Sequence, residues 1–157
     1  MKITRNGVDF ELTREEMKEA HDAYGLLVEA ELVKEHIPKS DIFNALPENV
    51  QNAFCVKVAK EARCFLERYG CSWHVAVDNV YVFLEDTLPI EYVKASLSER
   101  EPFKSIPEEK INDVYEEIAD FMEGIMLRKD KTPADAFESA VDIWMEDYGV
   151  QEAENED

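Results

Sequence analysis

The chain has 157 residues, 45% of them hydrophobic, and carries 36 acidic against 17 basic side chains, a net charge of −19. This length favours one domain that buries its own core. The charge argues against direct binding to nucleic acid or to an anionic membrane, which both attract basic proteins, and it favours a partner with a basic surface.

The first 12 residues predict a β-hairpin. Asn6-Gly7 is a preferred two-residue hairpin turn, because both positions tolerate a positive φ. Val8, Phe10 and Leu12 alternate with acidic residues, which gives the second strand one apolar face. Two strands are marginal alone, so this face should pack against a helix.

A helix should follow, because Thr13 and Glu16 have the spacing of a capping box. Apolar residues then recur at helical spacing until Pro38 ends the pattern. Gly25 is expected to break this segment into two helices, since glycine is unfavourable in a helix interior.

The next elements are a short helix or turn in "SDIFNA" and a long helix after Pro47. Gly70 suits the position just past the end of that long helix. The apolar residues predicted to be buried along it are Val50, Phe54, Val58, Ala62 and Phe65.

Residues 72–86 fit two structures. Alternating valines around Asp78-Asn79 suit a second hairpin, whereas the spacing of Trp73, Val77 and Leu84 suits a helix. A comparison within the chain favours the helix. Shifted by 60 residues, residues 31–80 match 91–140 at 10 of 50 positions.

The second copy contains a clear helix after Thr132, with proline at its first position. The shift therefore predicts an internal duplication of a helical hairpin, the alternative being two helix pairs that share a register by chance. The expected fold is mainly α, a bundle of about five or six helices with a small N-terminal β-hairpin. It forms one domain over residues 1–148, followed by an acidic flexible tail at 149–157.

Catalytic chemistry has little support. Cys71 and His74, with Cys64 before them, resemble a metal site but lack a fourth ligand. Nothing marks a residue that would orient a Cys71–His74 nucleophile, and there is no glycine-rich phosphate loop. We therefore expect no enzymatic activity, no cofactor and no metal. The three cysteines, with no apolar leader before them, suggest reduced thiols in the cytoplasm.

The most specific feature is a pair of acidic rows at helical spacing. Such rows are usually solvated faces, but here the acidic excess is concentrated in the second half of the chain, and residues 132–157 contain no base. A helix advances about 4.5–6 Å over three or four residues, which is comparable with the spacing of phosphates along a nucleic-acid strand. The candidate partner-binding residues are Glu109, Asp113, Glu116, Asp120 and Glu123 in one helix, and Asp135, Glu138, Asp142 and Glu146 in the last helix.

The opening "ITRNGVDFELTREEM" resembles small acidic proteins carried on phages and mobile elements of Firmicutes, which often begin with a hairpin followed by "LT-x-E-E". Thr13, Glu15 and Glu16 carry the resemblance, with a fainter echo at "SWHVAVDN". Some proteins of this kind inhibit host defence systems, including anti-CRISPR proteins that occupy nucleic-acid sites. The resemblance thus implies an inhibitor of that type.

The expected function is a non-enzymatic acidic protein that mimics nucleic acid and occupies the basic groove of a protein target, such as a nucleic-acid-binding nuclease. The alternative is a structural or adaptor protein that binds a partner through an apolar helical surface. In that case the exposed members of an aromatic set should matter more than the acids. That set is Trp73, Tyr81, Phe83, Trp144 and Tyr148.

Overall fold

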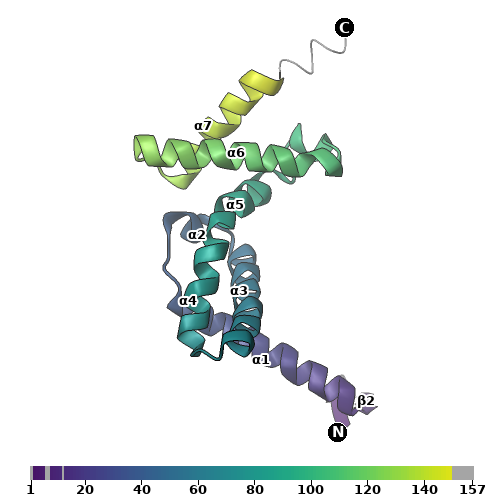
Figure 1. The fold of residues 1–157 in the computed structure, drawn as a ribbon. Coiled ribbons are helices and arrows are strands. Elements are labelled where there is room, and N and C mark those ends of the chain that lie inside the picture. Colours follow the sequence, from purple (N-terminus) through teal and green to yellow (C-terminus); the bar gives the residue numbers. More distant parts are fainter. Residues whose placement is uncertain (1, 6–7, 12, 150–157) are drawn as a thin grey trace. The chain divides into compact units, whose positions relative to one another are not determined.

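A computed structural model describes the backbone of residues 2–5, 8–11 and 13–149, and the side chains of 13–16 and 18–147. The described chain is mainly helical (Figure 1), and it contains six helices of ten residues or more, as the sequence predicted. The helices are α1 (Arg14–His36), α2 (Asp41–Ala45), α3 (Glu48–Tyr69), α4 (Trp73–Leu84), α5 (Leu88–Leu97), α6 (Glu108–Lys129) and α7 (Pro133–Trp144). Short 3₁₀ turns, η1 (Glu85–Thr87) and η2 (Phe103–Ser105), precede α5 and α6, and a π-helical turn, η3 (Met145–Gly149), follows α7.

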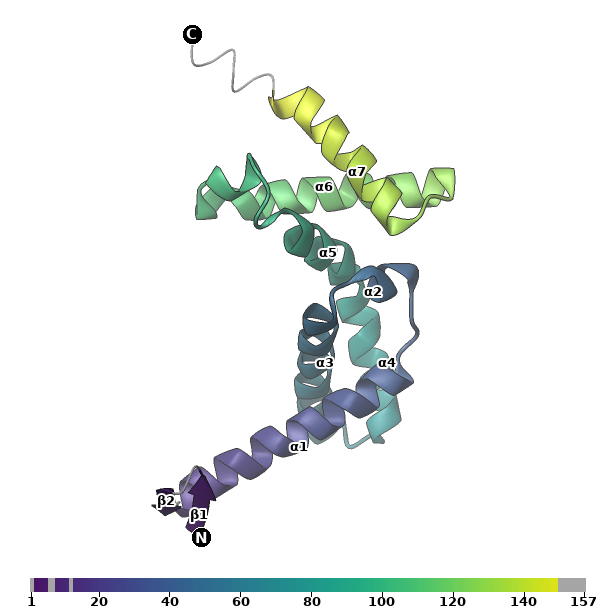
Figure 2. The same cartoon turned by 180° about the vertical axis from the view of Figure 1, so that it is seen from behind.

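The N-terminal strands β1 (Lys2–Arg5) and β2 (Val8–Glu11) run antiparallel at the start of α1 (Figure 2), with Arg5 opposite Val8. The predicted Asn6-Gly7 turn and all side chains of the first 12 residues lie outside the described part. A hairpin with an apolar face packed on a helix therefore stays a prediction. The acidic tail predicted at 149–157 also lies outside it from residue 150 onward.

Helix α1 is capped as predicted but is not broken at Gly25. The backbone amide of Thr13 donates to Glu16 at 2.8 Å, and the amide of Glu16 donates to the Thr13 hydroxyl at 3.2 Å. Gly25 instead leaves room for a side chain of α3, because a Cβ there would lie 3.3 Å from Nη2 of Arg63. Arg63 Nε donates to Glu29 at 2.6 Å and ties α3 to α1.

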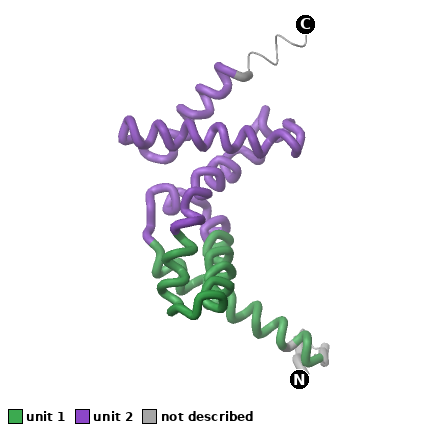
Figure 3. The backbone as a smooth tube through the Cα atoms, in the orientation of Figure 1, with its two compact units in different colours: residues 1–37, 52–81 green, residues 38–51, 82–157 purple. Residues whose placement is uncertain are grey.

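The chain divides into two compact units (Figure 3). The first comprises residues 1–37 and 52–81, and the second 38–51 and 82–157. In the first unit α1, α3 and α4 bury aliphatic side chains such as Val33, Val58 and Val77, none of which is exposed. Phe54 of α3 and Tyr81 of α4 meet edge to face, with their ring centroids 6.3 Å apart.

In the second unit α5, α6 and α7 enclose a core that includes Ile118 and Met122, both fully buried. The short helix α2 packs against α5 and α7, and its Phe43 is only 1% exposed. Aromatic pairs hold the edges of this core. The rings of Tyr92 and Phe137 lie 5.5 Å apart, and those of Phe103 and Trp144 lie 5.3 Å apart.

The two halves of the chain share one register. Helices α3 and α6 begin at 48 and 108 and end at 69 and 129, while α4 and α7 begin at 73 and 133 and end at 84 and 144. Residues 73–84 are thus helical and not a hairpin, as the internal comparison favoured. The four buried residues that α4 contributes recur in α7 at the same shift. They are Ala76, Val77, Val80 and Tyr81, matched by Ala136, Phe137, Ala140 and Val141. A duplication requires this shared register, but a common origin of the two copies stays a prediction.

Gly70 and Asp130 occupy equivalent positions after α3 and α6, and both have a left-handed backbone, with φ of 63° and 49°. Glycine adopts this conformation without the steric cost that a Cβ adds. We expect Asp130→Gly to raise the free energy of unfolding by about 1 kcal/mol, and Gly70→Asp to lower it by a similar amount. Urea denaturation measures both changes; equal signs would contradict the assignment of the two helix ends.

Candidate acidic interface

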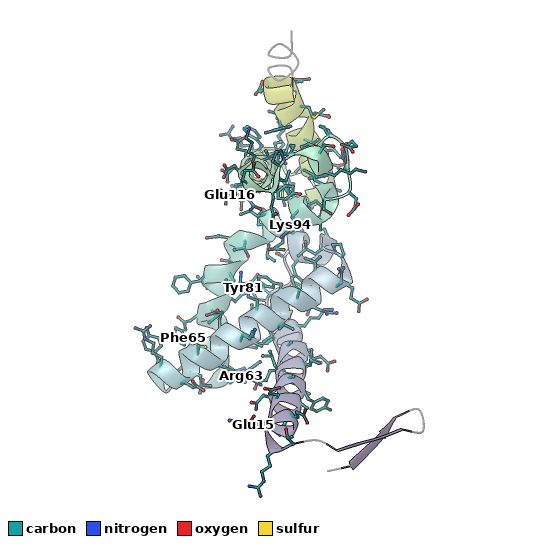
Figure 4. All side chains as sticks on the ribbon, turned by 90° about the vertical axis from the view of Figure 1, so that its right-hand side faces the viewer. Glu15, Arg63, Phe65, Tyr81, Lys94 and Glu116 are labelled. Carbon is teal, nitrogen blue, oxygen red and sulfur yellow. The ribbon has the colours of Figure 1, made fainter. Side chains whose placement is uncertain are left out.

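The acidic row of α6 lies on the solvent side of the helix. Glu109, Asp113, Glu116 and Asp120 are exposed, and Glu123 is partly buried. Figure 4 looks nearly along α6 and labels Glu116 among the side chains that radiate from it. The row extends about 21 Å, at 1.5 Å per residue. The buried side of the same helix is formed by Tyr115, Ile118, Ala119 and Met122.

Glu123 is the last residue of the row and lies near two other acids. Its pKa is raised, first because partial burial removes water from the carboxylate, and then because Asp120 and Asp86 repel its negative charge. Asp86 belongs to the turn η1, before α5. This end of the row therefore contains three acids from two segments that are distant in sequence.

The second predicted row differs from the first. Asp135, Glu138 and Asp142 lie on the exposed side of α7, but Glu146 lies beyond the helix, which ends at Trp144. Glu146 belongs to the π-helical turn η3, which directly continues α7. Glu138 already has a basic partner, because Arg100 Nη1 lies 3.2 Å from its Oε1.

The two rows do not face each other. Helices α6 and α7 pack through their buried sides, and each row lies on the other side of its helix. Figure 2 shows α7 leaving α6 at an oblique angle rather than running beside it. The acids of α7 consequently do not extend the α6 row, which is formed by α6 alone.

The surroundings of the cysteines and His74 differ. Cys55 is buried and Cys64 is exposed, and within the described residues no group of three His, Cys, Asp or Glu side chains is placed to hold a metal ion. The ring of His74 lies tilted against that of His36, with ring centroids 4.9 Å apart. His36 Nε2 lies 2.8 Å from Asp78 Oδ1. Sequence reasoning missed this contact because His36 belongs to α1 and His74 to α4, and no local pattern links them.

The described members of the aromatic set differ in exposure. Phe83 is 77% exposed, but Tyr81 and Trp144 are buried and Trp73 is half-buried. Trp144 packs in the core and donates from Nε1 to Glu117 at 3.1 Å. The side chain of Tyr148 lies outside the described residues.

Comparisons with protein-family models, curated proteins and solved structures found no match. None of the helices in the described part of the chain is both long and apolar enough to cross a membrane.

The raised pKa of Glu123 has a consequence for stability. A carboxyl group with a raised pKa in the folded state binds protons more readily there than in the unfolded chain, so stability falls as pH rises through that pKa. We expect Glu123→Gln to stabilise the protein at pH 7 by about 0.5 kcal/mol, the size of like-charge repulsion on a helix, and to lose this advantage near pH 4. Thermal denaturation at both pH values measures the change; destabilisation at pH 7 would show that the carboxylate has a favourable partner.

Proposed function

We propose that this protein is a non-enzymatic, nucleic-acid-mimicking inhibitor that acts in the cytoplasm. Its α6 row occupies the basic groove of a protein that binds nucleic acid, such as a nuclease. One observation carries the proposal. The first four carboxylates of the row are exposed, and within the described residues none of the four is in a salt bridge.

The fold does not require these acids. Helix α3 has the same length and register as α6, and it contains no acid at any of the five equivalent positions. Those positions hold Asn49, Ala53, Val56, Lys60 and Arg63 in place of the five acids. Like charges three or four residues apart cost a helix a few tenths of a kcal/mol per pair. The row therefore lowers the stability of α6 slightly.

The mechanism is competition for cations. Lys and Arg side chains that line a nucleic-acid groove hold phosphates spaced a few ångströms apart, and a helix places successive carboxylates about 4.5–6 Å apart along its axis. Because the carboxylates are exposed, a basic groove can reach them directly, and charge-assisted hydrogen bonds to its Lys and Arg offset the water that the carboxylates lose on binding. The net charge of −19 attracts a basic groove from a distance. The resemblance to anti-defence proteins of mobile elements points to the same class of target.

The alternative is an adaptor that binds through an apolar helical surface. In the aromatic set, the observation that favours it is the exposed ring of Phe83. Replacing Phe83 by alanine should abolish partner binding under this alternative and leave it unchanged under the proposal.

The test uses affinity capture from a lysate of the host, with elution by salt. We expect the full chain to retain a basic protein whose affinity falls at least tenfold between roughly 50 and 200 mM salt, because several charge contacts are lost together. A variant with Glu109, Asp113, Glu116 and Asp120 changed to Gln or Asn should retain little of that protein.

The matched control neutralises Glu15, Glu19, Glu61 and Glu67, four exposed acids of the first unit. It removes the same charge and should leave capture nearly intact. An equal loss of capture in both variants would show that net charge alone explains the binding. Salt-insensitive capture by the α6 variant would refute the proposal.

A further inference from the structure

Helix α1 has an apolar face that nothing in the described structure covers. Tyr24 is 70% exposed, Leu27 59% and Leu32 48%, and Val28 lies between them. At helical spacing these four residues share one side of α1. The described side chains that α1 buries, Ala30 and Val33, are both in its second half and point to the other side.

Two positions on α5 that lie 60 residues further along are packed. At the 60-residue shift Val28 matches Leu88 and Leu32 matches Tyr92, both on α5. Leu88 is 2% exposed and Tyr92 is half-buried, and α5 is packed against the short helix α2. Val28 is 40% exposed. Two positions of the α1 face thus correspond to packed positions on α5, where the ring of Tyr92 meets Phe137 of α7.

A small groove continues this face. It has a volume of about 220 Å³ and is lined by apolar side chains of α1 and α3 that include Leu27 and Val56. Glu31 and Lys34 stand at its polar edge, where Lys34 Nζ donates to Asn52 at 3.0 Å. The volume is below the usual range for small-molecule sites, which suits one or two inserted side chains.

The N-terminal strands are too short to cover this face. Each has four residues, about 13 Å of extended chain. Leu27 lies about 21 Å along the helix from Thr13, and Leu32 about 28 Å. A hairpin folded back from the start of α1 would therefore end before either leucine.

Charge distinguishes the two other candidates for covering this face, a second copy of the chain and a basic protein partner. A second copy would bring another 19 negative charges to the same face. Glu31 and Glu35 extend the apolar side of α1 by successive helical turns, and α1 contains seven acids against three lysine or arginine residues. We propose that α1 docks a basic amphipathic helix of a protein partner, whose apolar side chains pack on Leu27 and Leu32 while its Lys and Arg pair with Glu31 and Glu35. This site is separate from the α6 row and does not rest on the function proposed above.

The probe is a synthetic amphipathic peptide of leucine and lysine, and the reference is a serine and lysine peptide of the same length and charge. Fluorescence anisotropy with the full chain measures the affinity of each peptide. Because the two peptides carry the same charge, the ratio of their affinities reports the contribution of the leucines. We expect a ratio of at least tenfold, falling roughly tenfold in the double variant Leu27→Ser, Leu32→Ser, since each leucine loses its contact area. Amide exchange should slow in residues 14–29, where no described side chain is buried, because such a helical segment is marginal alone.

The matched control is Leu127→Ser on α6, where the side chain is 88% exposed and lies in the other unit. It should keep the affinity ratio of the unchanged protein. A ratio near one, or an equal loss in the control, would overturn the proposal. So would a dimer in sedimentation equilibrium that Leu27→Ser and Leu32→Ser dissociate, because the occupant would then be a second copy.

Discussion

The burial of one side of each long helix holds this protein together and leaves the other side free to vary. In α6, Ile118 and Met122 are fully buried, and each contributes about 1.5–3 kcal/mol through the apolar surface it removes from water. The repulsion along the acidic row costs only a few tenths of a kcal/mol per pair. The helix can therefore carry four exposed like charges, because its stability depends on the opposite side.

Helices α3 and α6 have similar buried sides and different exposed sides. Both helices run for 22 residues and bury equivalent positions, yet Lys60 in one corresponds to Asp120 in the other. Packing restricts the buried positions in both copies and places no such restriction on the exposed ones. Packing therefore does not account for the difference in charge between α3 and α6, and a partner with a basic groove is the explanation that we favour.

Local signals in the sequence predicted most of the helical structure. The capping box at Thr13, the glycine at 70 and the 60-residue register each act over a few residues or through simple periodicity, so they could be recognised without coordinates. The break expected at Gly25 was wrong: α1 continues through it, and the missing Cβ leaves room for Arg63, 38 positions away, which pairs with Glu29 of the same helix.

The candidate surfaces were only partly predictable for the same reason. Spacing places the α6 acids on one side of a helix, but it does not show that Glu138 on α7 is paired with Arg100. Helical spacing also puts Tyr24, Leu27 and Val28 on one apolar side of α1, and such a side normally lies in the core. Their exposure depends on whether another element covers them, and this is a property of the tertiary structure alone.

The central claim is that the acidic row of α6 takes the place of nucleic acid. Its most direct test is competition on the complex captured from the host lysate. Duplex DNA or RNA, added in excess at constant ionic strength, should release the captured protein, while an uncharged polymer should not. A captured protein that stays bound when nucleic acid is added, and that binds nucleic acid and this chain at the same time, would contradict the account.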